Sequence, residues 1–151
     1  MHNSILTIAR FTFLESVSNR LFALTFVGLF CVFGLCEFVG ELAISETNKI
    51  QAILIGAGMR LFAVATIALF VITSMVREFN EKGFDLIASL PLPRYHYYFG
   101  KFLGFFLFSL IVAIPTSGLL LIYSPTLTVS LWFLSLVCEL GIIISLSLLC
   151  L

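Results

Sequence analysis

Three ionisable residues, Glu37, Arg60 and Glu139, lie within or at the edge of long apolar stretches. A charge at membrane depth is costly, so each of them needs a partner, water or a lipid headgroup. Counting ~1.5 Å of rise per residue puts Glu37 about 24 Å and Arg60 about 25 Å along their stretches, at a common level near the outer boundary. We predict either that these two pair or that each reaches the headgroups alone. Glu139 should lie deeper, about 18 Å into its stretch, as a passive hydrogen-bonded carboxyl or a contact on a substrate path.

Motifs of catalysis and of ATP binding are absent from the chain. Gly100-Lys101 is followed by Phe102 and has Tyr95 where a phosphate-binding loop begins with glycine. Neither G-x-S-x-G nor H-E-x-x-H occurs. We therefore predict no catalytic residue, no metal and no cofactor, and any ATP would be bound by a partner subunit. The histidines and cysteines, which show no metal-ligand spacing, are His2, His96, Cys31, Cys36, Cys138 and Cys150.

The composition is that of a membrane protein. Of the 151 residues, 61% are hydrophobic and only 11% are charged, and the mean hydropathy is +1.18. The basic and acidic residues cancel to a net charge of zero, which gives no electrostatic reason to expect nucleic acid as a partner. A chain of this kind belongs in lipid, which is itself an expected partner.

Four apolar stretches of about 18 to 25 residues each match the thickness of a bilayer. We predict an all-α integral membrane protein, in one domain over residues 1–151, with a helix before the first span and a loop between the second and third. The predicted segments are 1–20 for the interfacial helix, 21–38, 53–76, 102–123 and 127–151 for the spans, and 77–101 for the loop.

Charge distribution predicts the sidedness of the spans. Lys and Arg gather before the first span and in the loop 77–101, which the positive-inside rule assigns to the cytoplasm. The connection 39–51 carries Glu41, Glu46 and a single Lys49. The N-terminus is therefore predicted to be cytoplasmic, in a multi-pass protein of the inner or plasma membrane. The basic residues used are Arg10, Arg20, Arg77, Lys82, Arg94 and Lys101.

The first twenty residues show a helical repeat of apolar side chains, which predicts a helix lying in the membrane interface. A plain N-terminal tail is the alternative. At the other end, the fourth span runs to Leu151 without a closing Lys or Arg, so we expect the sequence to be part of a longer chain. The apolar residues of the N-terminal repeat are Ile5, Leu6, Ala9, Phe13 and Val17.

The loop 77–101 contains an amphipathic helix by its periodicity, and Pro91 and Pro93 end it. After it, aromatic residues from Tyr95 to Phe99 form a belt, with Lys101 free to extend toward the interface. A pair of small residues, Gly100 and Gly104, would let another helix approach closely. The apolar side of the amphipathic helix holds Phe79, Gly83, Leu86, Ile87 and Leu90, and the polar side holds Glu78, Glu81, Lys82 and Asp85.

Residues 77–83, 86–94 and 100–104 of this loop resemble the cytoplasmic loop of type-2 ATP-binding-cassette (ABC) exporter permeases. In that family acidic residues, a leucine-rich turn, a proline, an arginine and a Gly-Lys pair follow one another as they do here. The Gly83-Phe84 dipeptide departs from the family's small-residue and Thr pair. The segment before the first span, from Ala9-Arg10 to Asn19-Arg20, also resembles the family's interfacial helix.

The resemblance implies a permease subunit for export, whose loop is a coupling helix that docks on a separate cassette ATPase. Family members have six spans and work in pairs, so a second permease copy is expected, with contacts that include the first two spans. The sequence alone leaves open a small structural or assembly membrane protein that recruits a cytoplasmic partner, and it leaves the transported substrate unassigned. The resemblance implies docking contacts at Glu78, Glu81, Lys82, Asp85 and Arg94, and packing of the loop through Phe79, Leu86 and Leu90.

Overall fold

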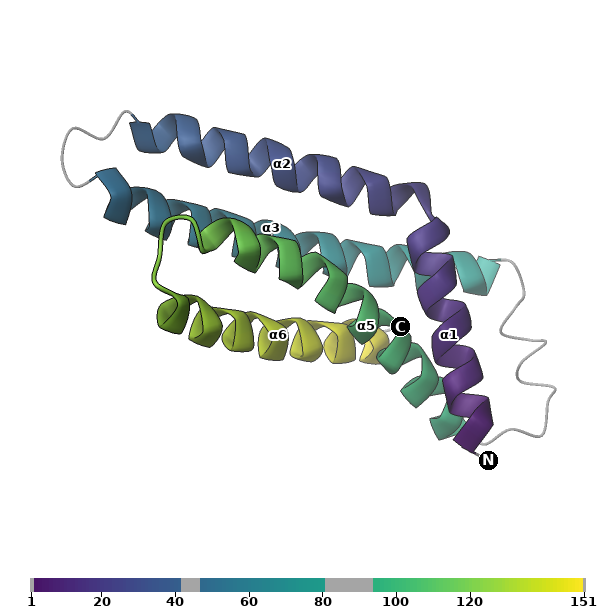
Figure 1. The fold of residues 1–151 in the computed structure, drawn as a ribbon. Coiled ribbons are helices and arrows are strands. Elements are labelled where there is room, and N and C mark those ends of the chain that lie inside the picture. Colours follow the sequence, from purple (N-terminus) through teal and green to yellow (C-terminus); the bar gives the residue numbers. More distant parts are fainter. Residues whose placement is uncertain (1, 42–46, 81–93, 151) are drawn as a thin grey trace.

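The described part of the chain, residues 2–41, 47–80 and 94–150 of a computed structural model, is helical apart from short connections (Figure 1). Helix-only architecture is expected for a chain in lipid, because a helix satisfies its backbone hydrogen bonds within one segment. The helices are α1 (His2–Ser18), α2 (Arg20–Glu41), α3 (Thr47–Asn80), α5 (Arg94–Leu120) and α6 (Thr126–Leu149).

Four of these helices are long and apolar enough to cross a membrane, as predicted. Their candidate spans are Arg20–Gly40, Ile50–Glu78, His96–Leu120 and Thr126–Leu149. Several boundaries differ from the prediction, most of all where α3 begins at Thr47 and continues to Asn80 and where α5 begins at Arg94. At the facing ends of α3 and α5, the helices extend past the apolar stretches because polar residues such as Glu78 and Lys101 find partners inside the protein.

Asn19 separates α1 from α2. Its side-chain Oδ1 accepts a hydrogen bond from the backbone N–H of Leu21 at 3.2 Å, and its carbonyl accepts one from Phe22 at 2.9 Å. This is the behaviour of an N-cap residue, which satisfies a backbone donor at the start of a helix. The cap lets the chain change direction, so α1 lies across the end of the bundle and α2 runs along it (Figure 1).

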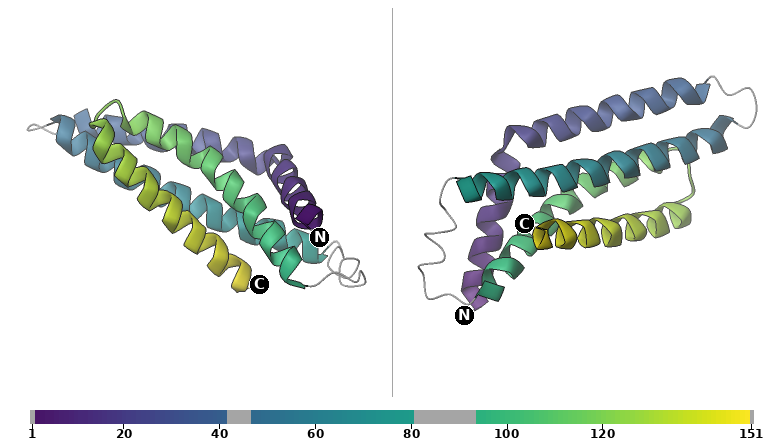
Figure 2. Two further views of the ribbon diagram at one scale, coloured as in Figure 1. Left: turned by 60° about the horizontal axis from the view of Figure 1, so that its bottom comes forward. Right: turned by 180° about the vertical axis from the view of Figure 1, so that it is seen from behind.

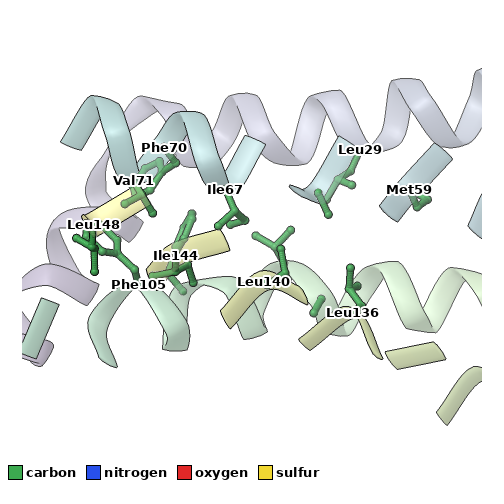
Figure 3. Packing of buried hydrophobic residues seen from close by; sticks show 14 of the residues in the cluster. Leu29, Met59, Ile67, Phe70, Val71, Phe105, Leu136, Leu140, Ile144 and Leu148 are labelled. Atoms are coloured by element: carbon green, nitrogen blue, oxygen red, sulfur yellow. The ribbon is translucent and has the colours of Figure 1, made fainter. Parts of the chain in front are cut away.

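Three of the spanning helices, α3, α5 and α6, pack against one another, and α2 lies along α3 outside this group. Helix α2 packs along α3, and α3 packs on α5 and α6, while α1 packs on the first part of α5 (Figures 1 and 2). Between α3, α5 and α6 lies the core, in which side chains such as Ile67, Phe105 and Leu140 are fully buried (Figure 3). Helix α2 has by far the smaller share in this core, and its long side chains are mostly exposed.

The contact between α1 and α5 depends on small residues. Ala9, Thr12 and Ser16 of α1 are buried, and Ala9 and Thr12 lie against Gly104 of α5. A Cβ atom added at Gly104 would lie 2.6 Å from Thr12 Cβ and 3.0 Å from the carbonyl oxygen of Ala9. At these distances glycine is the residue that fits at position 104 without a shift of α1. The prediction that the Gly100 and Gly104 pair admits a second helix agrees with this contact at Gly104, and α1 is the helix that it admits.

The apolar face predicted for α1 overlaps the face that packs. Ala9 is buried against α5 and the half-buried Phe13 packs against the core, while Leu6 is 65% exposed. Small residues take the protein side because the helix axes are too close for larger ones. Long side chains such as Phe11 and Leu14 are left exposed, on a face they share with Arg10. That exposed face is the one a membrane interface would cover, and the interfacial location of α1 stays a prediction.

Replacing Gly104 by Ala should therefore loosen α1 from the bundle. The added methyl collides with Thr12 and with backbone, and we expect a loss of about 1–3 kcal/mol in the free energy of unfolding. Thermal unfolding of the protein in detergent measures it. The matched control is Gly34→Ala, because no heavy atom lies within 4 Å of a Cβ at that position. It should stabilise α2 slightly through helix propensity. Equal effects at both positions would contradict the proposed close contact.

Candidate functional site

A charged cluster, the membrane-depth ion pair, joins α3 to α6 inside the candidate spans. Arg60 Nε donates to Glu139 Oε2 at 2.5 Å, and Arg60 Nη2 donates to Ser135 Oγ at 3.0 Å. Ser135 and Glu139 lie one turn apart on α6, so both face Arg60. The Arg60 side chain is 34% exposed and that of Glu139 is 37% exposed. The pair is thus held by two helices but open on one side.

Both members of this pair lie inside their candidate spans, Glu139 near the middle of its span and Arg60 about a third of the way along its own. At ~1.5 Å per residue, Arg60 is about 15 Å from the start of its span at Ile50, and Glu139 is about 20 Å from the start of its span at Thr126. The prediction had placed Arg60 near the outer boundary by counting from Arg77. The level of Arg60 stays a prediction, because the span of α3, with 29 residues from Ile50 to Glu78, is longer than a bilayer requires and its ends do not fix the depth.

The structure does not contain the predicted pair of Glu37 and Arg60. Arg60 pairs with Glu139, while Glu37 accepts a hydrogen bond from the hydroxyl of Tyr123, in the turn between α5 and α6. The reason is helix geometry. Gly58 of α3 faces α2, where Cys36 Sγ lies 2.9 Å from the position of its missing Cβ. Arg60 is two residues further, about 200° around the helix, and therefore points away from α2 toward α6.

A second group of charges, the loop-end cluster, connects three helices at the opposite end of the bundle from Tyr123. Arg77, in the last turn of α3, pairs with Glu15 of α1. The next residue, Glu78, pairs with Lys101 Nζ of α5 at 2.5 Å and accepts a hydrogen bond from the Tyr97 hydroxyl at 2.8 Å. Two consecutive residues of α3 thus hold α1 and α5. The cluster consists of Glu15, Arg77, Glu78, Tyr97 and Lys101.

Lys101 is the buried member of this cluster. Its side chain is 6% exposed and that of Glu78 is 18% exposed, and the Nζ atom lies 6.0 Å and 5.9 Å from the ring centres of Tyr97 and Phe105. The prediction that Lys101 extends into the interface is therefore wrong. Glu78 supplies a counter-charge within the protein, and two aromatic faces add cation–π attraction. Burial of this kind is tolerated only for a paired ammonium group.

The remaining predicted site residues lie at or beyond the described ends of α3 and α5. Glu81, Lys82, Asp85, Leu86 and Leu90 lie outside the described residues. Phe79 belongs to the last turn of α3, and Arg94 is the first residue of α5. Glu78 is the one predicted docking residue whose side chain is described, and its carboxylate is engaged by Lys101 and Tyr97. It anchors the end of α3.

Four partner residues were missed by the sequence analysis: Glu15, Tyr97, Tyr123 and Ser135. Ser135 had a usable signal, since it lies four residues before Glu139 on a helix and must share its face. The other three contact residues that are distant in sequence, so no local spacing indicates them. Among the described residues, no group of three His, Cys, Asp or Glu side chains is placed to hold a metal ion.

Comparison with protein-family models, with curated proteins and with solved structures found no match for this chain. Evidence about its function therefore comes from its own residues. Two charged clusters join the described helices, one inside the candidate spans of α3 and α6 and one where α3 ends and α5 begins.

Arg60 and Glu139 should prove energetically coupled. Removing one partner leaves the other charge unpaired at membrane depth. The losses in the free energy of unfolding caused by Arg60→Gln and by Glu139→Gln should therefore add up to more than the loss in the double variant. We expect a coupling energy of about 0.5–3 kcal/mol from a double-mutant cycle of unfolding in detergent or lipid. Glu37→Gln combined with Arg60→Gln is the control, and its effects should add within about 0.5 kcal/mol. Coupling of Arg60 to Glu37 rather than Glu139 would contradict the structure.

The two ion pairs of the loop-end cluster should differ sharply in strength. Glu78→Gln leaves the buried Lys101 ammonium without a counter-charge, and we expect a loss of about 3–5 kcal/mol in the free energy of unfolding. Glu15→Gln removes the same chemical group from an exposed pair with Arg77, and should cost about 1 kcal/mol or less. Chemical denaturation of the two variants side by side measures both. Similar losses would mean that burial does not distinguish the pairs.

Proposed function

We propose that this chain is the permease subunit of a type-2 ABC exporter, forming the translocation pathway for export that a separate ATPase subunit drives. The proposal starts from the resemblance of residues 77–104 to that family's cytoplasmic loop. The observation that carries it further is the loop-end cluster, because this cluster joins both ends of the loop to the rest of the bundle.

The loop-end cluster suits a coupling role for mechanical reasons. In the sequence, residues 81–93 connect the end of α3 to the start of α5. The ion pair of Glu78 and Lys101 joins these two helix ends to each other. Arg77 fastens the same end of α3 to Glu15 of α1. A force applied to the loop would thus reach α1, α3 and α5 together rather than bend one helix. In this proposal ATP is bound and hydrolysed on the partner subunit.

The docking contacts of the proposal are Glu81, Lys82, Asp85 and Arg94, with Phe79, Leu86 and Leu90 packing the loop against the bundle. Glu78 takes a different role from the one the resemblance implies, since its carboxylate joins α3 to α5. A cytoplasmic N-terminus and a location in the inner or plasma membrane belong to the same proposal, because the ATPase must reach the loop.

A second candidate is a small structural or assembly membrane protein whose loop recruits a different soluble protein without transport. The exposure of α2 favours this candidate, because a helix with so few buried side chains in its own chain is suited to assembly with other proteins. The two candidates differ in the identity of the protein bound to the loop.

Affinity purification from the native membrane should therefore recover a cassette ATPase with the chain. Changing Glu81→Lys together with Asp85→Lys should reduce the recovered ATPase at least tenfold, because reversed charges oppose the partner's surface. The amount of chain in the membrane should not change. The control is Asn3→Lys with Ser4→Lys, which adds positive charge on the same predicted side, outside the loop. Recovery of a soluble protein that is not an ATPase, lost in the same variant, would favour the second candidate.

A further inference from the structure

The membrane-depth ion pair is incompletely covered. Arg60 and Glu139 lie inside their candidate spans, and about a third of each side chain is exposed. Hydrocarbon gives charged groups neither solvation nor hydrogen bonds, so charged residues inside a span face protein or water. Within the described residues, no further protein group contacts the open side of the pair. Something else has to cover it.

The hydrogen-bonding capacity of the pair is also only partly used. A guanidinium group carries five N–H donors, and Arg60 uses one on Glu139 and one on Ser135. Within the described part of the chain, Glu139 Oε1 accepts no hydrogen bond. Donors and an acceptor thus remain available side by side, on the exposed edge of the pair. A lipid chain can satisfy neither kind of group.

The surface around the pair belongs to α3 and α6 and is accessible to another helix. In the view from behind, α3 and α6 lie toward the viewer, with α5 behind them (Figure 2, right). Ala57 of α3, three residues before Arg60, is exposed, and Ile142 of α6, three residues after Glu139, is 60% exposed. Small residues of this kind allow a helix of another molecule to come close. We call this surface the α3–α6 face.

We propose that a second copy of this chain covers the α3–α6 face, so that Arg60 of each copy contacts Glu139 of the other. The argument is charge complementarity. A face with one positive and one negative group side by side is complementary to itself under a twofold rotation. An axis along the membrane normal keeps depth unchanged, so the second copy's Glu139 arrives at the level of Arg60. The four charges then alternate in sign, and the remaining donors and acceptor find partners.

The inference deepens the proposed function and rests on it for the expectation that two copies act together. The choice of surface comes from the ion pair. The proposed surface differs from the expected contact, which includes the first two spans, because it keeps α3 and has α6 in place of α2. Within the proposed exporter it would place two Arg60 and Glu139 pairs at the centre of the assembly.

Disulfide crosslinking in native membranes tests the surface directly. In a chain with all four cysteines replaced, we introduce Ala57→Cys or Ile142→Cys on the α3–α6 face and oxidise the membranes. Each should give at least fivefold more crosslinked dimer than a control chain that keeps Cys31, an exposed residue of α2. Dimer formed through Cys31 and not through either introduced cysteine would overturn the proposal. Both charges are retained in this assay, so folding of the chain is not at risk.

A charge exchange between two copies tests the contact itself. A chain with Arg60→Glu and a chain with Glu139→Arg, carrying different tags, should each lose at least fivefold of their dimer when expressed alone. Expressed together they should recover at least half of the wild-type dimer, because opposite charges then meet across the interface. A third chain carries both changes and restores the pair within one copy. If that chain accumulates normally while the coexpressed chains show no recovery, the pair acts only within one copy and the proposal fails.

The two readouts keep this inference separate from the proposed function. Dimer formation is measured by crosslinking and by the recovery of differently tagged chains, whereas the exporter proposal depends on an ATPase that copurifies. A dimer without an ATPase would support the surface and oppose the function. Recovery of an ATPase without a dimer through this face would support the function and oppose the surface.

Discussion

The absence of water from the bilayer interior is the constraint on which the rest of this structure depends. It requires helices, because each backbone donor must find its acceptor within the same segment. It also requires partners for polar side chains at depth, at a cost of about 2.5–3.5 kcal/mol for a charged residue at the centre of a span. Arg60 meets that requirement through Glu139 and Ser135, and Glu37 meets it through Tyr123.

Close approach of α1 to α5 follows from a different physical cause, the lack of a side chain at Gly104. Lipid and apolar side chains are equally apolar, so helices in a membrane associate through close packing rather than through the hydrophobic effect. The small buried residues of α1 provide that packing. Once α1 is held there, Glu15 lies within reach of Arg77, and the end of the bundle becomes one connected unit.

The two charged clusters differ in how completely the single chain satisfies them. Lys101 is enclosed by Glu78 and two aromatic rings, so the loop-end cluster is complete within one copy. The membrane-depth ion pair is not, since about a third of each side chain stays exposed inside the candidate spans. A complete cluster suits a rigid joint between loop and spans. An incomplete one suits a surface where another molecule contributes the rest.

The amino-acid sequence by itself determined that four helices are long and apolar enough to cross a membrane, because hydropathy and length are properties of each segment alone. It also indicated that Glu139 needs a partner and that Gly104 admits a close neighbour. Which partner each residue takes was decided by the tertiary structure. A count along a helix estimates depth only when the ends of the span are known. The direction in which a side chain points around the helix axis turns by about 100° with every residue. Which neighbour it faces is set only when the other helices are in place. Gly58 faces α2 and Arg60 faces α6 for that reason, and Lys101 is buried because α3 brings Glu78 to it.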